Sequence, residues 1–375
     1  MGVGTESPQT FETKGALEGQ NQESKSEENS KASAFKSLGF LDRYLALWIL
    51  LAMIVGVLLG NFVEGIERTL HRGKFVGVSL PIAIGLLIMM YPILCKVQYE
   101  VLHHAFSKRE LWIQIAFSIF VNWIVAPFLM LGLAWAFLPD KSELRNGLIL
   151  VGLGRCIAMV LIWNGLAAGD SNYCAILVVI NSILQIALFA PLAVLFINVI
   201  GDADELKISY STVATNVAVF LGIPLGAAVI TRFFIRHFAG PSKYEIFMKW
   251  LSPWSLIGLL YTILILFASQ GRQVIHQIVS VVRVAAPLTV YFIVIFVATL
   301  AVTHRLGFGY KLSVTQSFTA ASNNFELAIA VAVATFGPDS DQALASTVGP
   351  LIEVPVLIGL VYLVRFIGKR WKWKD

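Results

Sequence analysis

Residues 147–168 read GLILVGLGRCIAMVLIWNGLAA, an apolar run whose middle holds Gly152, Gly154, Arg155 and Cys156. The run is long enough to cross a bilayer, for which about 20 apolar residues suffice. Glycines weaken a helix, and an arginine at the centre of a membrane span costs about 2.5–3.5 kcal/mol to insert. We therefore predict a membrane helix that breaks near its centre and keeps these polar groups away from lipid.

A similar irregularity lies in the second half of the chain, where Ser322-Asn323-Asn324-Phe325-Glu326 interrupts another apolar run. Overlaying the chain on itself with an offset of 169 residues places Arg155 on Asn324. Each half then carries five apolar runs, so the second copy must be inverted across the membrane. Inverted repeats with discontinuous helices are typical of secondary transporters. The pattern predicts paired broken helices that form a transport site.

Composition places the chain among membrane proteins. Of its 375 residues, 57% are hydrophobic and only 14% are charged, whereas a soluble domain carries about 25% charged residues. The net charge of +5 therefore indicates membrane topology rather than nucleic-acid binding. We expect an all-α polytopic membrane protein with a lipid bilayer, and no nucleic acid, as its partner.

Ten apolar runs predict ten transmembrane helices, separated by polar turns. The runs lie at about 41–62, 75–95, 112–138, 146–168, 171–200, 212–236, 250–269, 283–303, 312–336 and 342–367. We expect one five-helix repeat over 38–205 and a second, inverted repeat over 206–367. Residues 1–37 are rich in Glu, Ser, Gln and Lys, which predicts a disordered tail, and 368–375 form a short basic tail.

The distribution of Lys and Arg predicts the orientation. An even number of spans places both termini on one side, and the loops and tails on that side hold about twice as many basic residues as the other side. Cytoplasmic segments carry this excess, so both termini are expected in the cytoplasm. That orientation suits a plasma membrane or a vacuolar membrane.

The two predicted breaks supply the candidate binding residues, which are Arg155, Cys156, Asn323 and Asn324. Broken helices leave free N–H groups at one half and free C=O groups at the other, which together suit a small polar solute. Arg155 either contacts that solute or pins two helices through a salt bridge to Glu326 or Glu353. Arginine keeps its charge, so it cannot carry a proton.

Glu326 and Glu353 are the candidates for proton coupling. A carboxylate held away from water but near an arginine can gain and lose a proton in the working pH range. Pro350 and Pro355 flank Glu353 and predict a distorted tenth span that lines the same chamber.

The three cysteines (Cys95, Cys156 and Cys174) have neither a CxxC pair nor metal-ligand spacing, so we expect no metal site, no disulfide framework and no cofactor. Small buried hydrophobic residues are the ordinary interpretation. For Cys156 the adjacent guanidinium favours the thiolate, the form that binds soft electrophiles. The amides Asn164, Asn181 and Gln185 also lie in apolar runs, where most amides join helix to helix.

Three segments carry a family resemblance. Residues 154–170 (GRCIAMVLIWNGLAAGD) resemble the fourth transmembrane segment of the arsenical-resistance (arsenite) permeases, within the bile acid/arsenite/riboflavin transporter superfamily. Residues 317–332 (SFTAASNNFELAIAVA) and 349–358 (GPLIEVPVLI) are similar to that family's ninth and tenth segments. The resemblance implies a ten-helix, five-plus-five inverted fold that exports As(III), and in some members Sb(III), in exchange for protons. It also implies that the essential cysteine is Cys156 and the essential acidic residue Glu326.

Two other functions can be distinguished from arsenite export. A sodium-coupled importer of an organic anion would share the fold and use Arg155 to bind the anion. An intramembrane aspartyl enzyme needs aspartates within spans, but Asp170, Asp339 and Asp341 lie in predicted turns, and the chain has no HExxH or phosphate-loop motif. We therefore expect a transporter rather than an enzyme.

Overall fold

The protein, in a computed structural model, is described at residues 44–70, 73–97, 109–157, 159–201, 207–276, 278–337 and 340–373. The tail predicted at 1–37 lies outside these ranges, as do residues 374 and 375. Residues Ala46–Asp375 form one compact unit, and the description below concerns that unit. Its described part is almost entirely helical, which confirms the predicted all-α class.

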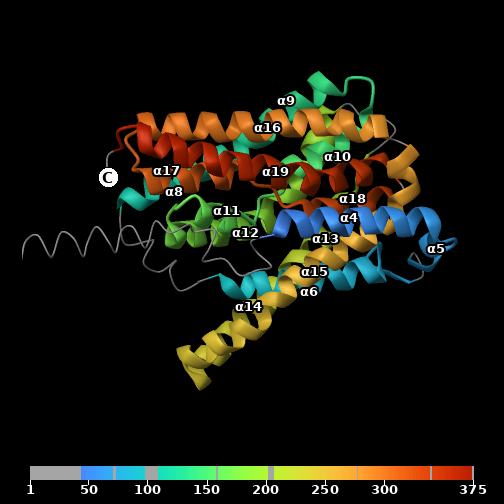
Figure 1. Cartoon of the computed structure of the whole chain (residues 1–375), viewed down its shortest axis with the longest axis horizontal. Coiled ribbons are helices and arrows are strands. Elements are labelled where there is room, and N and C mark those ends of the chain that lie inside the picture. The colour runs from blue at the N-terminus through green and yellow to red at the C-terminus, as the bar shows by residue number, and fades with distance from the viewer. Residues whose placement is uncertain are drawn as a thin grey trace, which may run out of the picture. The chain divides into compact units, whose positions relative to one another are not determined.

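Figure 1 shows the described helices in chain order. In the first half they are α4 (Leu45–Phe62), α5 (Ile66–Leu70), α6 (Leu80–Lys96), α8 (Arg109–Phe120), α9 (Ala126–Phe137), α10 (Ser142–Leu153), α11 (Met159–Leu166) and α12 (Ser171–Val194). In the second half they are α13 (Tyr210–Val217), α14 (Ile223–Phe234), α15 (Pro241–His276), α16 (Ile278–Arg305), α17 (Tyr310–Ala321), α18 (Phe325–Phe336) and α19 (Asp341–Arg370). Four π-helical turns continue neighbouring helices: η1 (Val121–Val125), η2 (Leu195–Ile200), η3 (Ala218–Gly222) and η4 (Ile235–Ala239).

The expectation of a helix over 75–95 is wrong at its start. Strands β1 (Lys74–Phe75) and β2 (Val78–Ser79) pair antiparallel, and α6 begins only at Leu80. Val76 and Gly77 join the strands with φ of 51° and 80°. Two positive φ values in a two-residue loop are the signature of a hairpin turn. The turn overrides the apolar pattern because neither residue has a helical backbone.

Six helices in the described part of the chain are long and apolar enough to cross a membrane. They are Leu111–Phe137, Ser171–Ile200, Tyr210–Ala239, Pro241–Ser269, Val279–Arg305 and Asp341–Arg370. Three shorter apolar helices, Leu47–Phe62, Leu80–Lys96 and Phe325–Phe336, accompany them. Length and composition therefore support a protein that spans the membrane several times.

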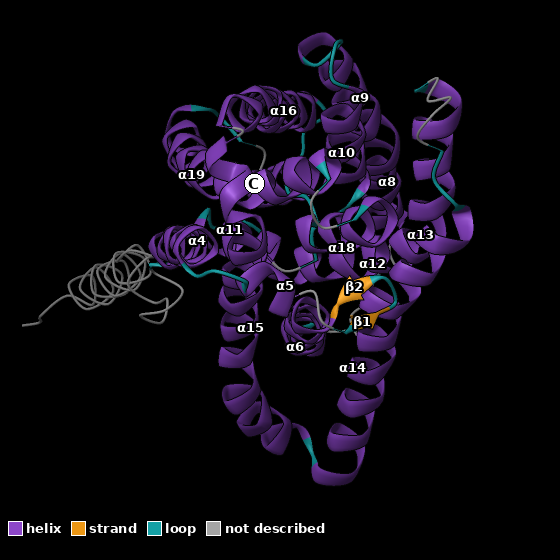
Figure 2. Cartoon of the chain, turned by 90° about the vertical axis from the view of Figure 1, so that its right-hand side faces the viewer, coloured by secondary structure: helices purple, strands orange, loops and turns teal. Residues whose placement is uncertain are grey.

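The helices of this unit pack in two groups. Helices α10, α16, α17, α18 and α19 pack on one another, and α6 packs along α14 and α15. In Figures 1 and 2 the second group lies below α10, α16, α18 and α19. Helices α6 and α15 approach closely because Gly258 has no side chain, and an added Cβ would lie 2.7 Å from Met89 N. Small residues permit such close contact between membrane helices.

Helix α19 brings Glu353 into the first group of helices. It begins after Ser340, whose hydroxyl accepts from Ala343 N at 3.2 Å, and continues through both Pro350 and Pro355 to Arg370. The distortion predicted at these prolines does not interrupt the helix. Membrane helices tolerate proline where neighbouring helices satisfy the freed backbone groups.

Candidate functional site

Two short non-helical segments cross in the protein interior. Residues 154–157 follow α10, and residues 322–324 connect α17 to α18. Arg155 and Asn323 form an antiparallel bridge. On either side of it, Cys156 N donates to Ser322 O at 3.3 Å and Asn324 N donates to Gly154 O at 3.1 Å. These two segments are called the crossing below. They satisfy some of each other's backbone hydrogen-bonding groups.

Local sequence explains why the helices end at the crossing. An added Cβ at Gly154 would lie 2.7 Å from Asn324 O, so only glycine permits this approach. Asn324 caps α18, because its Oδ1 accepts from Leu327 N at 3.1 Å. Asn323 Nδ2 donates to the carbonyls of Val151 at 2.8 Å and Gly154 at 3.2 Å. The two asparagines thus satisfy the end of α10 and the start of α18, as helix ends require.

Arg155 is fully buried and is held by oxygen atoms without formal charge. Its Nη1 donates to Tyr291 OH at 3.3 Å and to Ala320 O at 3.5 Å, and Nη2 donates to Gly152 O. These carbonyls lie in the last turns of α17 and α10, where the helix dipole favours a cation. One of the two predicted roles of Arg155 was a salt bridge to Glu326 or Glu353. Among the described residues this salt bridge does not form.

Cys156 is buried, with an exposed fraction of 4%. Its Sγ accepts from Val160 N at 3.4 Å, in the first turn of α11. A thiol at the N-terminal end of a helix faces N–H donors, the setting found around reactive cysteines. All three cysteines are described, and each is a buried thiol rather than part of a disulfide.

Both predicted carboxylates lie at or beside the crossing. Glu353 is buried, and its Oε1 accepts from Ser322 Oγ at 2.9 Å. Glu326 is the second residue of α18 and is partly exposed. Glu353 is therefore hydrogen-bonded to one segment of the crossing, whereas Glu326 lies two residues beyond its end.

Four buried polar atoms at the crossing have no hydrogen-bond partner in the described part of the chain. They are Arg155 Nε, Gln185 Nε2, Asn323 Oδ1 and Asn324 Nδ2. Gln185 joins this group because its Oε1 accepts from Arg155 N at 2.5 Å. An unsatisfied buried polar group costs about 1–3 kcal/mol. Three donors and one acceptor are thus available to water or to a small polar solute.

The structure separates the predicted residues into two groups. Arg155, Cys156, Asn323, Asn324 and Glu353 meet at the crossing, with Glu326 beside it. Two of the predicted amides instead join helices, since Asn164 Oδ1 accepts from Thr315 and Asn181 Oδ1 accepts from Trp123 Nε1.

Sequence reasoning did not name Tyr291 as a site residue, and it placed Ser322 in the predicted break without giving it a role. A single tyrosine in an apolar run gives no signal of its own. Ser322, in contrast, directly precedes the predicted pair Asn323-Asn324 and could have been included.

Comparisons with known proteins agree on one group of relatives. The sodium bile acid symporter family matches residues 83–277. The arsenical-resistance protein Acr3 of Corynebacterium glutamicum is 47% identical over 339 residues, covering 89% of this chain and 91% of that protein. Acr3 of Alkaliphilus metalliredigens is 31% identical over 337 residues, covering 87% and 92%. An uncharacterised transporter of Synechocystis is 32% identical over 358 residues, covering 90% and 92%.

Proposed function

Because the chain belongs to the arsenical-resistance permeases of the sodium bile acid symporter family, we propose that it exports arsenite from the cytosol in exchange for protons. Antimonite is a second proposed substrate. The observation that carries this proposal is the crossing, where a buried thiol lies among buried polar atoms without partners. A membrane protein rarely buries such groups without a functional reason.

Arsenous acid matches this chemistry as a substrate. It is small, largely neutral at pH 7 and thiophilic. In the proposed binding step the Cys156 sulfur displaces one hydroxyl from As(OH)₃, an As–S bond forms, and the thiol proton leaves with that hydroxyl as water. Hydrolysis reverses the step for release. The unpartnered atoms of Asn323, Asn324 and Gln185 would bind the remaining hydroxyls.

Glu326 and Glu353 are the proposed proton carriers. Exchange needs a driving force, because a neutral solute gains nothing from the membrane potential. One inward proton supplies about 2.3 kcal/mol per 100 mV, which sustains a gradient of roughly 50-fold. Protonation of Glu353 would alter its bond to Ser322, at 2.9 Å, and so would act directly on the crossing.

For the architecture we propose ten spans in two inverted repeats, 38–205 and 206–367. In this proposal α10–α11 and α17–α18 are two discontinuous spans, four and nine. Support comes from α10 and α17, two helices of 12 residues that both end at the crossing and are each followed by a second helix. We further propose that both termini, including the basic tail 368–375, are cytoplasmic, in a plasma or vacuolar membrane.

Arsenite uptake into everted vesicles tests the function. We expect wild-type uptake to stop when the proton gradient and potential are collapsed, and Cys156→Ala to lose most transport. Cys174→Ala, another fully buried cysteine, is the matched control and should transport normally. Full transport by Cys156→Ala would contradict the proposed role of the thiol. Uptake that continues without any gradient would contradict proton coupling.

The same vesicles test the sodium-coupled alternative, which the family description favours. That function would show sodium-dependent transport of an organic anion and no response to arsenite. The engagement of Arg155 Nη1 and Nη2 with protein oxygens supports arsenite over an anion, because little of the guanidinium remains for a carboxylate.

A further inference from the structure

A cavity with basic side chains lies away from the crossing, beside the hairpin formed by α14, η4 and α15. Its volume is about 450 Å³. The residues that matter here are four basic side chains, one acidic side chain and one tyrosine: Lys96, Arg232, Arg236, Lys249, Glu245 and Tyr244. Among the described residues of the lining, basic groups exceed acidic ones by three, so this lining attracts anions.

Arg232 occupies a prearranged position in this cavity. It is 5% exposed, and its Nη1 donates to Cys95 O at 3.2 Å. Tyr244 OH donates to the same carbonyl at 2.6 Å, and the guanidinium lies 5.0 Å from the centre of the Tyr244 ring. The end of α6 and the start of α15 thereby hold the cation in place. An arginine positioned in this way offers a planar set of donors suited to phosphate oxygens.

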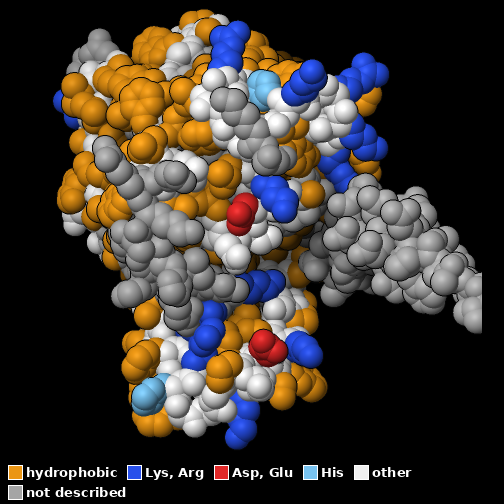
Figure 3. All heavy atoms as spheres, turned by 90° about the vertical axis from the view of Figure 1, so that its left-hand side faces the viewer, with side chains coloured by type: hydrophobic (Ala, Val, Ile, Leu, Met, Phe, Trp, Pro, Cys, Tyr) orange, Lys and Arg blue, Asp and Glu red, His pale blue; other side chains and the backbone are white. Residues whose placement is uncertain are grey.

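The helices that line the cavity carry exposed aromatic side chains. Phe233 and Phe238 on the α14 side are 65% and 72% exposed, and Trp250 on α15 is 80% exposed. In Figure 3 the hairpin is the lower arm, where basic side chains lie among hydrophobic ones. Both helical segments, Tyr210–Ala239 and Pro241–Ser269, are long and apolar enough to cross a membrane. The basic residues lie near their shared turn, which would lie near the bilayer surface.

From this arrangement we propose that the cavity binds the phosphate headgroup of an anionic membrane phospholipid. Arg232, Arg236, Lys96 and Lys249 contact the headgroup, while the acyl chains lie along the exposed aromatic residues of α14 and α15. Basic pockets between membrane helices bind lipid headgroups in this way. A free phosphate ion would bind to the same donors but would make no contact with the exposed aromatic side chains of α14 and α15. This difference favours a lipid as the ligand.

The test is binding of short-chain phosphatidylglycerol to the purified full-length protein in neutral detergent, followed by native mass spectrometry and by the thermal midpoint. Phosphatidylcholine of the same chain length and inorganic phosphate are the parallel probes. The pocket variant is Arg236→Gln/Lys249→Gln, which leaves buried Arg232 intact. The charge-matched control is Lys369→Gln/Arg370→Gln, at the end of α19 and outside the cavity lining.

We expect wild type and the control variant to bind phosphatidylglycerol and to gain thermal stability from it. The pocket variant should lose about 30-fold in affinity, the effect of two interfacial basic side chains. The charge-conserving variant Arg236→Lys/Lys249→Arg should keep most of the wild-type affinity. Equal binding of phosphatidylcholine, or unchanged affinity in the pocket variant, would overturn the proposal. Displacement of the lipid by inorganic phosphate, with equal stabilisation, would assign the cavity to a soluble anion instead.

Discussion

At the scale of single residues, the crossing depends on residues that each have a role the others could not fill. Gly154 permits the backbone contact, Asn323 and Asn324 satisfy helix ends, and Arg155 binds to carbonyl oxygens. Cys156 contributes its sulfur beside these groups. Each of these roles depends on atom positions within a few tenths of an ångström, so substitutions here should affect stability and transport together.

Gly154→Ala should destabilise the protein by about 1–3 kcal/mol, the usual cost of overpacking. Its new Cβ would lie 2.7 Å from Asn324 O, so the two segments must move apart and transport should fall. Gly132→Ala in α9 is the matched control, because an added Cβ there meets nothing within 4 Å. Thermal unfolding in detergent and vesicle transport measure both variants, and equal behaviour of the two would contradict the close contact.

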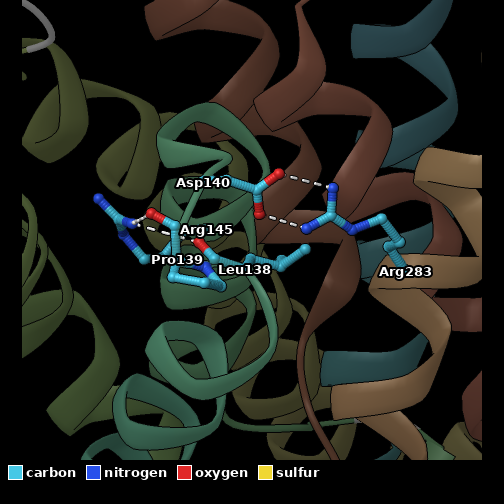
Figure 4. A network of polar contacts seen from close by, with 5 residues as sticks. All are labelled: Leu138, Pro139, Asp140, Arg145 and Arg283. Atoms are coloured by element: carbon cyan, nitrogen blue, oxygen red, sulfur yellow. Dashed lines mark hydrogen bonds and ion pairs between the residues drawn. The ribbon is translucent and has the colours of Figure 1, made fainter.

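At the scale of secondary-structure elements, a charged contact joins the turn between α9 and α10 to α16. Arg283 donates to both carboxylate oxygens of Asp140, one of them at 2.9 Å (Figure 4). Arg145 holds the same turn, because its Nη1 donates to Leu138 O and Pro139 O, each at 3.2 Å. The contact positions α10, which leads to the crossing.

Asp140→Asn should lower the thermal midpoint slightly, and the double reversal Asp140→Arg/Arg283→Asp should recover part of the loss. Arg283 lowers the pKa of Asp140 from 3.8 to about 2. The stabilisation is therefore complete above about pH 4 and is lost as pH falls through 2, so the effect should be equal at pH 5 and pH 8. High salt should reduce it, because the pair is exposed.

The control for this pair is Glu143→Gln, an exposed acidic residue in the first turn of α10. Its thermal midpoint should fall only by the weak helix-dipole contribution of a first-turn carboxylate, and this loss should not depend on Arg283. A difference between the wild-type and Asp140→Asn midpoints that is the same at low and high salt would argue against an electrostatic origin.

At the scale of the whole molecule, the proposed transport cycle joins the crossing to the proton gradient. Helices α10 and α17 end at the residues that the sequence singled out, and α19 brings Glu353 to the same place. The proposed substrate site is formed by both halves of the chain, so it can respond to a relative movement of its two segments, as alternating access requires.

Glu326→Gln should abolish arsenite accumulation against a gradient, because an amide cannot carry the proton. Glu326→Asp keeps the carboxylate and should retain measurable coupling. Ser322→Ala, which removes the bond to Glu353 at 2.9 Å but no ionisable group, should slow transport without removing its dependence on the proton gradient. The measurement is vesicle uptake with and without an imposed pH gradient; unimpaired coupling in Glu326→Gln would shift the role to Glu353.

The sequence by itself determined the membrane class, the helical content and the candidate site residues, because composition, apolar run length and local capping chemistry act over a few neighbouring residues. The family resemblance rested on equally local motifs and is confirmed by the relatives. Only the tertiary structure decided which groups meet: Arg155 binds Tyr291 and helix-end carbonyls instead of a carboxylate. It also revealed the hairpin at 74–79 and the basic cavity between α6, α14 and α15. Such contacts join residues far apart in the chain, so they depend on how whole helices pack.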